Sequence, residues 1–339
     1  MGAAGVNFYE AYIELGDIDV WEKNPQNALQ HYEKALAIYS DYRVAHERLC
    51  SAYVQLGKFE EALKVLDKDD AYGPTPRSIE MRKKLNSVTR GPSWSGETIT
   101  LESDNYIVKT NVSQSMAQTL SDCAEQIRDH YDEMFPDIDK PDRKYLIFVF
   151  DSRESYLADG SPENSGGYYD PQFRRLMLYQ YPQLDTTLRV FKHEGFHQYC
   201  HEYLDYIPSW FNEGLADYFS ASEPVQSKGK TVMRIIPNDE RLRWLKSAMR
   251  QGHDFSARRL MNMTQAEMYR EDMHLNYAHG WSLVYFSIHG ANGKYRPVLV
   301  KYFKELRKKT PWTEVYDKTY GRVNMKAFEK EWTDFLLAL

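Results

Sequence analysis

Two histidines four residues apart constrain this chain more than any other feature. They are His193 and His197 in TTLRVFKHEGFHQYCHEYL, where large apolar residues recur at helical spacing over about 20 residues. Four residues advance about 6 Å along a helix and return to nearly the same face, so both imidazoles can meet one metal ion. Glu194 completes the H-E-x-x-H zinc signature as candidate general base. The alternative is a surface helix with two solvated histidines.

A carboxylate in the next predicted helix can supply a third ligand. YIPSWFNEGLADYFS starts a helix after Pro208, with Ser209 as N-cap and Glu213 one turn further on. The connection 204–209 is short, so the two helices should pair as an antiparallel hairpin that returns Glu213 to His197. Two imidazoles and one carboxylate leave a position for water, as catalytic zinc requires. We therefore expect Zn²⁺ as the cofactor, held by His193, His197 and Glu213.

Three nearby residues outside the ligand set also need an interpretation. Asp217 lies four residues beyond Glu213 and can accept the other ring N–H of a ligating histidine, or it is a plain helix carboxylate. His201 lies eight residues after His193, about 12 Å along the helix and about 80° around it, so we expect a surface histidine. Gly195 lowers the stability of a helix, so either the Glu213 helix packs closely against it or the helix simply tolerates this glycine.

The first 85 residues have the pattern of helical hairpins. Ala28 and Ala62 are 34 residues apart within similar helical stripes, and Leu15-Gly16 is echoed by Leu56-Gly57. Each Leu-Gly pair should end the first helix of a hairpin, and Asp17 to Asn24 should lengthen the first turn. A further helix at about Pro76 to Asn86 should cap the stack. This period resembles the tetratricopeptide repeat, which implies a protein partner. The alternative is a small helical domain without a binding role.

A turn-rich linker, Asn86 to Thr98, separates this region from a different pattern. Strands are expected at 99–103, 106–110 and 144–150 and as a pair around Asp170-Pro171, with a helix at 113–135. From Leu184 the chain should be mostly helical, with one short strand near Val232 to Ile236. The fold class is therefore α+β, with domains at 1–90 and 91–339.

Composition excludes several classes of protein. Forty-three basic and 49 acidic residues give a formal charge of −6, which does not favour nucleic acid or an anionic membrane as partner. Cys50, Cys123 and Cys200 are widely spaced and odd in number, so they indicate neither a cysteine-based zinc knuckle nor a disulfide framework. No apolar run is long enough for a membrane span, and the start MGAAGVNFYE lacks a signal peptide. The compartment stays open, either cytoplasmic or exported with a trimmed signal.

The two helical motifs together resemble those of the gluzincin metallopeptidases. HEGFH followed by NEGLAD is similar to thermolysin-like enzymes, in which the glutamate binds zinc and the aspartate supports a histidine. The pattern Pro-x-Trp-x-x-Glu-Gly-x-Ala-x-Tyr resembles the peptidase-MA-like bacterial proteins, which often carry tetratricopeptide repeats. The likeness covers about Gly166 to His289 and implies a thermolysin-like zincin domain, with a small sheet that has an edge strand. The short interval from His197 to Glu213 leaves the branch open.

The resemblance also implies roles outside the two helices. Gluzincins stabilise the oxyanion with a Tyr or His from a later helix, which here is Tyr277 or His279, with His274 a weaker candidate. The edge strand of the family corresponds to Phe173 to Tyr181, which would pair with the substrate backbone, and Gly166-Gly167 would ease close approach. Glu163 could grip an α-amine, but no aminopeptidase-type G-x-M-E-N segment is present, which favours an endopeptidase.

Three hypotheses for function follow from these residues. The first is a zinc-dependent peptidase in which Glu194 is the general base and Tyr277 or His279 stabilises the oxyanion. The second is a peptidase-fold scaffold without activity that binds a partner through its helical repeats. The third keeps the metal but hydrolyses another amide, such as one in a cell-wall peptide.

Overall fold

The computed structural model describes residues 8–136, 138–141, 143–227, 229–253, 256–270 and 272–339. Residues 1–7, on which most of the signal-peptide prediction rests, lie outside the described residues. The chain forms two compact units. The helical unit comprises Met1–Thr98, Arg153–Glu163 and Asp170–Arg175, and the mixed unit comprises Ile99–Ser152, Asn164–Tyr169 and Leu176–Leu339. Neither unit is one continuous stretch of the chain.

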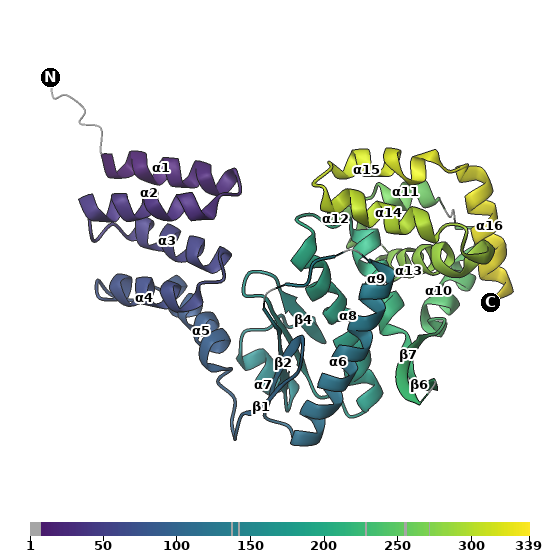
Figure 1. Ribbon diagram of the computed structural model, residues 1–339, viewed down its shortest axis with the longest axis horizontal. Helices are drawn as coiled ribbons and strands as arrows, with labels where there is room; N and C mark the ends of the chain where they lie inside the picture. Colours follow the sequence, from purple (N-terminus) through teal and green to yellow (C-terminus); the bar gives the residue numbers. More distant parts are fainter. Residues whose placement is uncertain (1–7, 137, 142, 228, 254–255, 271) are drawn as a thin grey trace. The chain divides into compact units, whose positions relative to one another are not determined.

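The helical unit is a stack of antiparallel helices (Figure 1). Small residues explain the close packing, because Ala28, Ala35 and Ala62 are fully buried where neighbouring helices meet. The helices of the stack are α1 (Phe8–Trp21), α2 (Pro25–Ile38), α3 (Arg43–Gln55), α4 (Phe59–Asp70) and α5 (Pro76–Arg90).

The two Leu-Gly pairs play different structural roles. Gly57 follows the end of α3 with φ +71°, as a turn glycine should. Gly16 does not end a helix, because α1 continues through Asp17 to Trp21, and that prediction was wrong. A Cβ on Gly16 would lie 2.3 Å from Cε1 of Tyr32, so this glycine allows α1 to approach α2. Close helix packing and a tight turn can both require glycine, so the sequence alone does not distinguish the two roles.

Two later segments complete the helical unit. The first contains α7 (Arg153–Ala158), a short helix that the sequence did not predict. The second is the turn between two strands, and its Phe173 is 1% exposed and belongs to the same hydrophobic cluster as the stacked helices.

The mixed unit contains a five-stranded sheet in the order β1-β2-β3-β5-β4. β1 pairs with β2 in antiparallel register, and β2 pairs with β3 in parallel register. The helix α6 (Gln114–Met134) lies between β2 and β3 in the sequence and connects these two parallel strands. The buried face of α6 packs with strand residues in one hydrophobic cluster. The strands are β1 (Ile99–Glu102), β2 (Tyr106–Thr110), β3 (Tyr145–Phe150), β4 (Gly167–Asp170) and β5 (Arg175–Tyr179).

The predicted edge strand at Phe173 to Tyr181 is not at the edge. β5 pairs with both β3 and β4, so β4 forms that border of the sheet. The turn at Asp170-Pro171 predicts both arms of this hairpin, but it does not say which arm joins the central strand.

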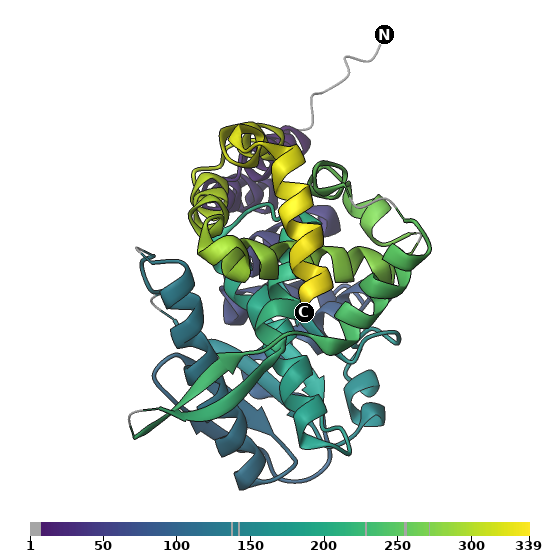
Figure 2. The same cartoon turned by 90° about the vertical axis from the view of Figure 1, so that its right-hand side faces the viewer.

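A second difference concerns the strand expected near Val232 to Ile236. The structure has an antiparallel ribbon of two strands there, β6 (Ser222–Ser227) and β7 (Lys230–Ile235), with Pro224 opposite Met233 (Figure 2). β6 was missed because SEPVQS is polar and contains a proline, which is typical of loops and tolerated only at a sheet edge.

Helices form the rest of the mixed unit. α8 (Leu184–Tyr203) and α9 (Ser209–Ser220) pair as neighbours, and α9 packs against α13 (Met273–His289). The remaining elements are α10 (Asp239–Arg250), α11 (Ala257–Met261), α12 (Gln265–Met268), η1 (Gly290–Gly293), α14 (Arg296–Arg307), α15 (Trp312–Lys318), η2 (Tyr320–Arg322) and α16 (Met325–Ala338). Among the described residues, no helix is both long and apolar enough to cross a membrane.

Glycines fix the crossing of α9 and α13. A Cβ on Gly214 would lie 2.5 Å from the carbonyl oxygen of Gly280, and one on Gly280 would lie 2.9 Å from that of Trp210. A Cβ on Gly195 would instead meet Tyr131 and Phe191 at 3.6 and 3.8 Å, ordinary contacts that do not involve α9. Close approach therefore explains Gly214, and simple tolerance explains Gly195.

Candidate metal centre

The hairpin of α8 and α9 brings three candidate ligands together. His193 and His197 lie one turn apart on α8, and Glu213 lies in the second turn of α9. The N-cap of α9 is Pro208 rather than Ser209, which is the first helical residue and is buried. Pro208, with φ −56° and ψ 133°, ends the short connection after Tyr203, and the pairing of α8 with α9 brings Glu213 to face both histidines.

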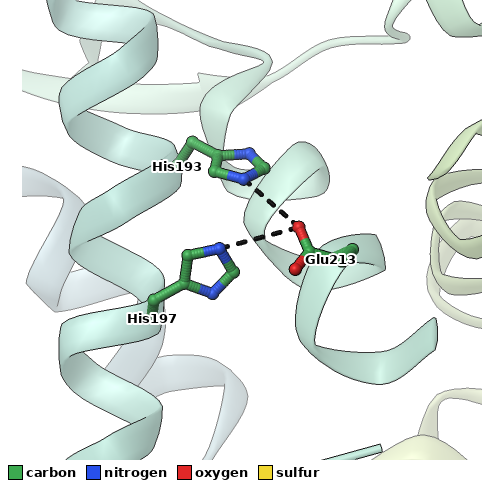
Figure 3. Close-up of side chains that lie close together, drawn as sticks. All are labelled: His193, His197 and Glu213. Carbon is green, nitrogen blue, oxygen red and sulfur yellow. Dashed lines mark ion pairs between the residues drawn. The ribbon is translucent and has the colours of Figure 1, made fainter. Parts of the chain in front are cut away.

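One carboxylate oxygen faces both imidazoles. Glu213 Oε2 lies 3.4 Å from His193 Nε2 and 3.6 Å from His197 Nε2 (Figure 3). The two rings are nearly perpendicular, with centroids 4.9 Å apart. One ligand atom from each of the three residues lies within 4.8 Å of the others. Two donors at about 2 Å from a tetrahedral ion lie about 3.3 Å apart, close to the distances from Glu213 Oε2 to the two histidine nitrogens.

The environment of Glu213 is compatible with a bound cation. The residue is 4% exposed, and its Oε2 accepts no hydrogen bond from the part of the chain that the structure describes. Burial alone would raise the pKa of its carboxyl group, but His197, His193 and Tyr269 hold that pKa below its usual value. A buried, ionised oxygen without a donor is unfavourable unless a charge compensates it, and a divalent cation between the three residues would do so.

The other nitrogen of each ring is already engaged. His193 Nδ1 lies 3.2 Å from Asp217 Oδ1, and His197 Nδ1 lies 2.9 Å from Asn212 Oδ1. These contacts favour the tautomer with the proton on Nδ1, which leaves each Nε2 lone pair for a metal. The contact of Asp217 is the one expected from the sequence, although its role stays a prediction.

Three further residues support this arrangement and were missed in the sequence. Asn212 adjoins Glu213, so the motif itself could have suggested it. The Tyr269 hydroxyl donates to Glu213 Oε1 at 2.6 Å, and Arg241 Nε donates to Asp217 Oδ2 at 2.6 Å. Tyr269 and Arg241 come from distant segments of the chain, and no spacing pattern in the sequence singles them out.

Glu194 lies beside the edge strand. Its Oε2 accepts a hydrogen bond of 3.2 Å from the Tyr169 backbone N–H of β4. A Cβ on Gly167 would lie 3.0 Å from Glu194 Cγ and 2.6 Å from Val190 Cγ1, so this glycine allows β4 to approach α8. The candidate base is thus held against β4 while its neighbour His193 faces α9.

The candidates for the oxyanion donor separate in the structure. The Tyr277 ring lies 6.1 Å from the Tyr269 ring, and the Arg241 guanidinium lies 5.5 Å above it, so Tyr277 lies beside the cluster. His279 instead lines a cavity of about 550 Å³ with Trp332 and is not brought to the three ligands. Two residues on a helix turn the side chain through about 200°, which is why Tyr277 and His279 point into different surroundings.

The weaker candidates lie elsewhere. His201 is exposed, with its ring 5.5 Å from that of Tyr169, and His274 is exposed and stacks on Trp244 at 5.3 Å. Glu163 is an exposed residue of the helical unit.

Two family models match the chain. Residues 22–84 match the tetratricopeptide repeat, which confirms the repeat prediction for α2 to α5. Residues 188–313 match a family described as a protein of unknown function, DUF1570, and this range contains all the clustered residues from His193 to Tyr277. No curated protein matches the sequence. The chain thus combines helical repeats with a mixed α and β region, whose likeness to a thermolysin-like zincin remains a prediction.

Proposed function

We propose that this protein is a zinc-dependent peptidase whose metal is held by His193, His197 and Glu213. The observation that supports this most is the position of Glu213 Oε2, which is buried, faces two imidazole Nε2 atoms and accepts no hydrogen bond from the described residues. Nitrogen and carboxylate donors in this number suit Zn²⁺ and leave one coordination position open. When bound, Zn²⁺ would polarise a carbonyl and lower the pKa of a water molecule to about 7.

Glu194 is the proposed general base. One of its oxygens accepts the Tyr169 N–H, which fixes the plane of the carboxylate, and the other can take a proton from the attacking water. Glu194 would then transfer this proton to the leaving amine. Tyr277 is the proposed donor to the oxyanion, because it lies beside the cluster whereas His279 does not.

The substrate is proposed to be an extended peptide bound along β4. Because β4 is a border strand of its sheet, it can accept another strand through backbone hydrogen bonds. Such binding is tolerant of sequence and favours internal bonds over chain ends, in agreement with the absence of an aminopeptidase-type segment from the sequence.

The test combines metal content with hydrolysis of an unstructured protein such as casein. Glu194→Gln should keep the wild-type zinc content and reduce kcat by at least about 10²-fold, because the amide cannot accept the proton. Equal turnover in this variant would remove Glu194 from the mechanism. A panel of peptide, ester and small amide substrates would identify an amidase that uses the same metal.

A non-catalytic scaffold is the second candidate, and the tetratricopeptide match favours it, because such repeats commonly bind proteins. A fully zinc-loaded chain that cleaves no member of a broad peptide library would support this candidate.

A further inference from the structure

The strand beside Glu194 is flanked on both sides by segments of the helical unit. Arg153–Glu163 and Asp170–Arg175 belong to that unit, whereas Asn164–Tyr169 between them belongs to the mixed unit. This short stretch contains Gly167 to Tyr169 of β4, and Tyr169 donates its backbone N–H to Glu194. The path of the main chain therefore ties both ends of this stretch to the helical repeats.

A buried polar network links the two flanking segments to α5. Arg175 Nη1 lies 3.1 Å from Asp159 Oδ2 and donates to Ser87 Oγ at 2.5 Å. Ser87 Oγ also lies 3.3 Å from Asp159 Oδ2, and the three residues are 1%, 5% and 3% exposed in the order Arg175, Asp159, Ser87. Loss of one partner from such a buried pair is strongly destabilising, so the network fixes both segments to α5.

Apolar and backbone contacts add to this attachment. Phe173 is buried in the helical core, and its ring lies 6.1 Å from that of Phe59 on α4. Arg174 donates to the carbonyl oxygen of Gln55 at the end of α3, at 3.1 Å. On the other flanking segment, the carbonyl oxygen of Ala158 accepts a hydrogen bond from Lys83 of α5.

We propose that the helical repeats bind the chain's own flanking segments and thereby position β4 against Glu194, with Arg175, Asp159 and Phe173 as the positioning residues. The partner of the surface formed by the end of α3, the start of α4 and one side of α5 is then the chain itself. An edge strand pairs with another strand on one side only, so it opens locally more readily than a central strand. Attachment at both ends reduces that freedom and lowers the entropy lost when a peptide pairs with the strand. The effect on hydrolysis rests on the proposed peptidase function, whereas the effect on β4 does not.

The experiment measures hydrogen exchange of the Tyr169 amide in the full-length, zinc-loaded chain. Arg175→Met should accelerate this exchange by about tenfold or more, because the anchor is lost while α8 and α9 are untouched. Zinc content should stay at the wild-type value, and KM for a peptide substrate should rise more than kcat falls. The matched control is Arg77→Met, which removes an exposed ion pair between Glu47 and α5, the helix that carries Ser87, and should change none of these quantities.

Two further variants distinguish loss of the attachment from unfolding of the whole chain. The double variant Asp159→Leu/Arg175→Met replaces the pair with apolar side chains and should return Tyr169 exchange toward the wild-type rate. Phe173→Leu reduces the apolar contact with the helical core and should accelerate Tyr169 exchange by less than Arg175→Met does. Wild-type exchange at Tyr169 in both Arg175→Met and Phe173→Leu would overturn the proposal, as would equal acceleration in Arg77→Met. A chain that cleaves no peptide but shows the predicted exchange pattern would refute only the proposed function.

Discussion

The Tyr269 hydroxyl donates a hydrogen bond of 2.6 Å to Oε1 of Glu213, the oxygen that does not face the histidines. The bond leaves Oε2 directed at both Nε2 atoms and fixes the rotation of the carboxylate. Tyr269 follows α12 in the sequence, 56 residues after Glu213, so the third candidate ligand depends on a distant segment for its orientation.

Tyr269→Phe should therefore weaken zinc binding. Loss of a hydrogen bond to a metal-ligating carboxylate typically lowers affinity by about 10-fold to 100-fold. Competition with a chromogenic chelator would measure the change. Tyr277→Phe is the matched control, because it should retain zinc affinity and lower kcat instead. Equal affinities in wild type and Tyr269→Phe would mean that the hydroxyl does not orient Glu213.

Asp217→Asn should also reduce zinc affinity, by about 10-fold or more. Asp217 accepts from Arg241 and contacts His193 Nδ1, and an amide in its place can present its NH₂ group to the histidine and so favour the wrong tautomer. The same chelator titration applies, and Arg189→Gln is the control, because Arg189 pairs with Glu240 at the surface. An unchanged affinity would reduce Asp217 to a structural carboxylate.

A pair of glycine substitutions tests the packing behind the metal centre. Gly214→Ala should destabilise the protein by about 1–3 kcal/mol, because its Cβ would lie 2.5 Å from a backbone oxygen of α13. Gly195→Ala should be neutral or stabilise by up to about 1 kcal/mol, since its Cβ meets only ordinary contacts. Denaturant unfolding of the zinc-free chains compares the two. Similar effects at both positions would contradict the glycine crossing of α9 and α13.

The Glu125 carboxylate should make stability depend on pH. Burial alone would raise the pKa of Glu125, but hydrogen bonds from Ser103 and Asn105 lower it overall. A lowered folded-state pKa means that its stabilisation is present above the unfolded value of about 4.3 and is lost as pH falls through the folded value. Glu125→Gln should destabilise the fold by about 1 kcal/mol at pH 7 and by less at pH 3. The denaturant midpoints of wild type and Glu125→Gln at both pH values measure the effect. An equal loss of stability at pH 7 and pH 3 would exclude the carboxylate charge as its cause.

Local patterns in the sequence predicted the parts of the structure that depend on local geometry. Helical spacing places His193 and His197 on one face of α8. The short connection after α8 forces α9 to pair with it, which brings Glu213 to the histidines. The position of β5 between β3 and β4 and the contacts of Tyr269 depend on segments far apart in the chain. Gly16 misled for a related reason, because its role depends on a neighbouring helix rather than on its own turn. β6 pairs with the adjacent β7, and it was missed because its polar sequence with a proline is typical of a loop.

The central claim is that three side chains from α8 and α9 bind one metal ion. Elemental analysis of the purified chain after equilibration with Zn²⁺ tests it most directly, with His193→Ala, His197→Ala and Glu213→Ala beside the wild type. We expect one zinc per wild-type chain and a large loss of zinc in each variant, whereas His274→Ala, which changes an exposed histidine outside the cluster, should keep the full zinc content. A wild-type chain without zinc, or variants that retain it, would contradict a metal site formed by these three residues.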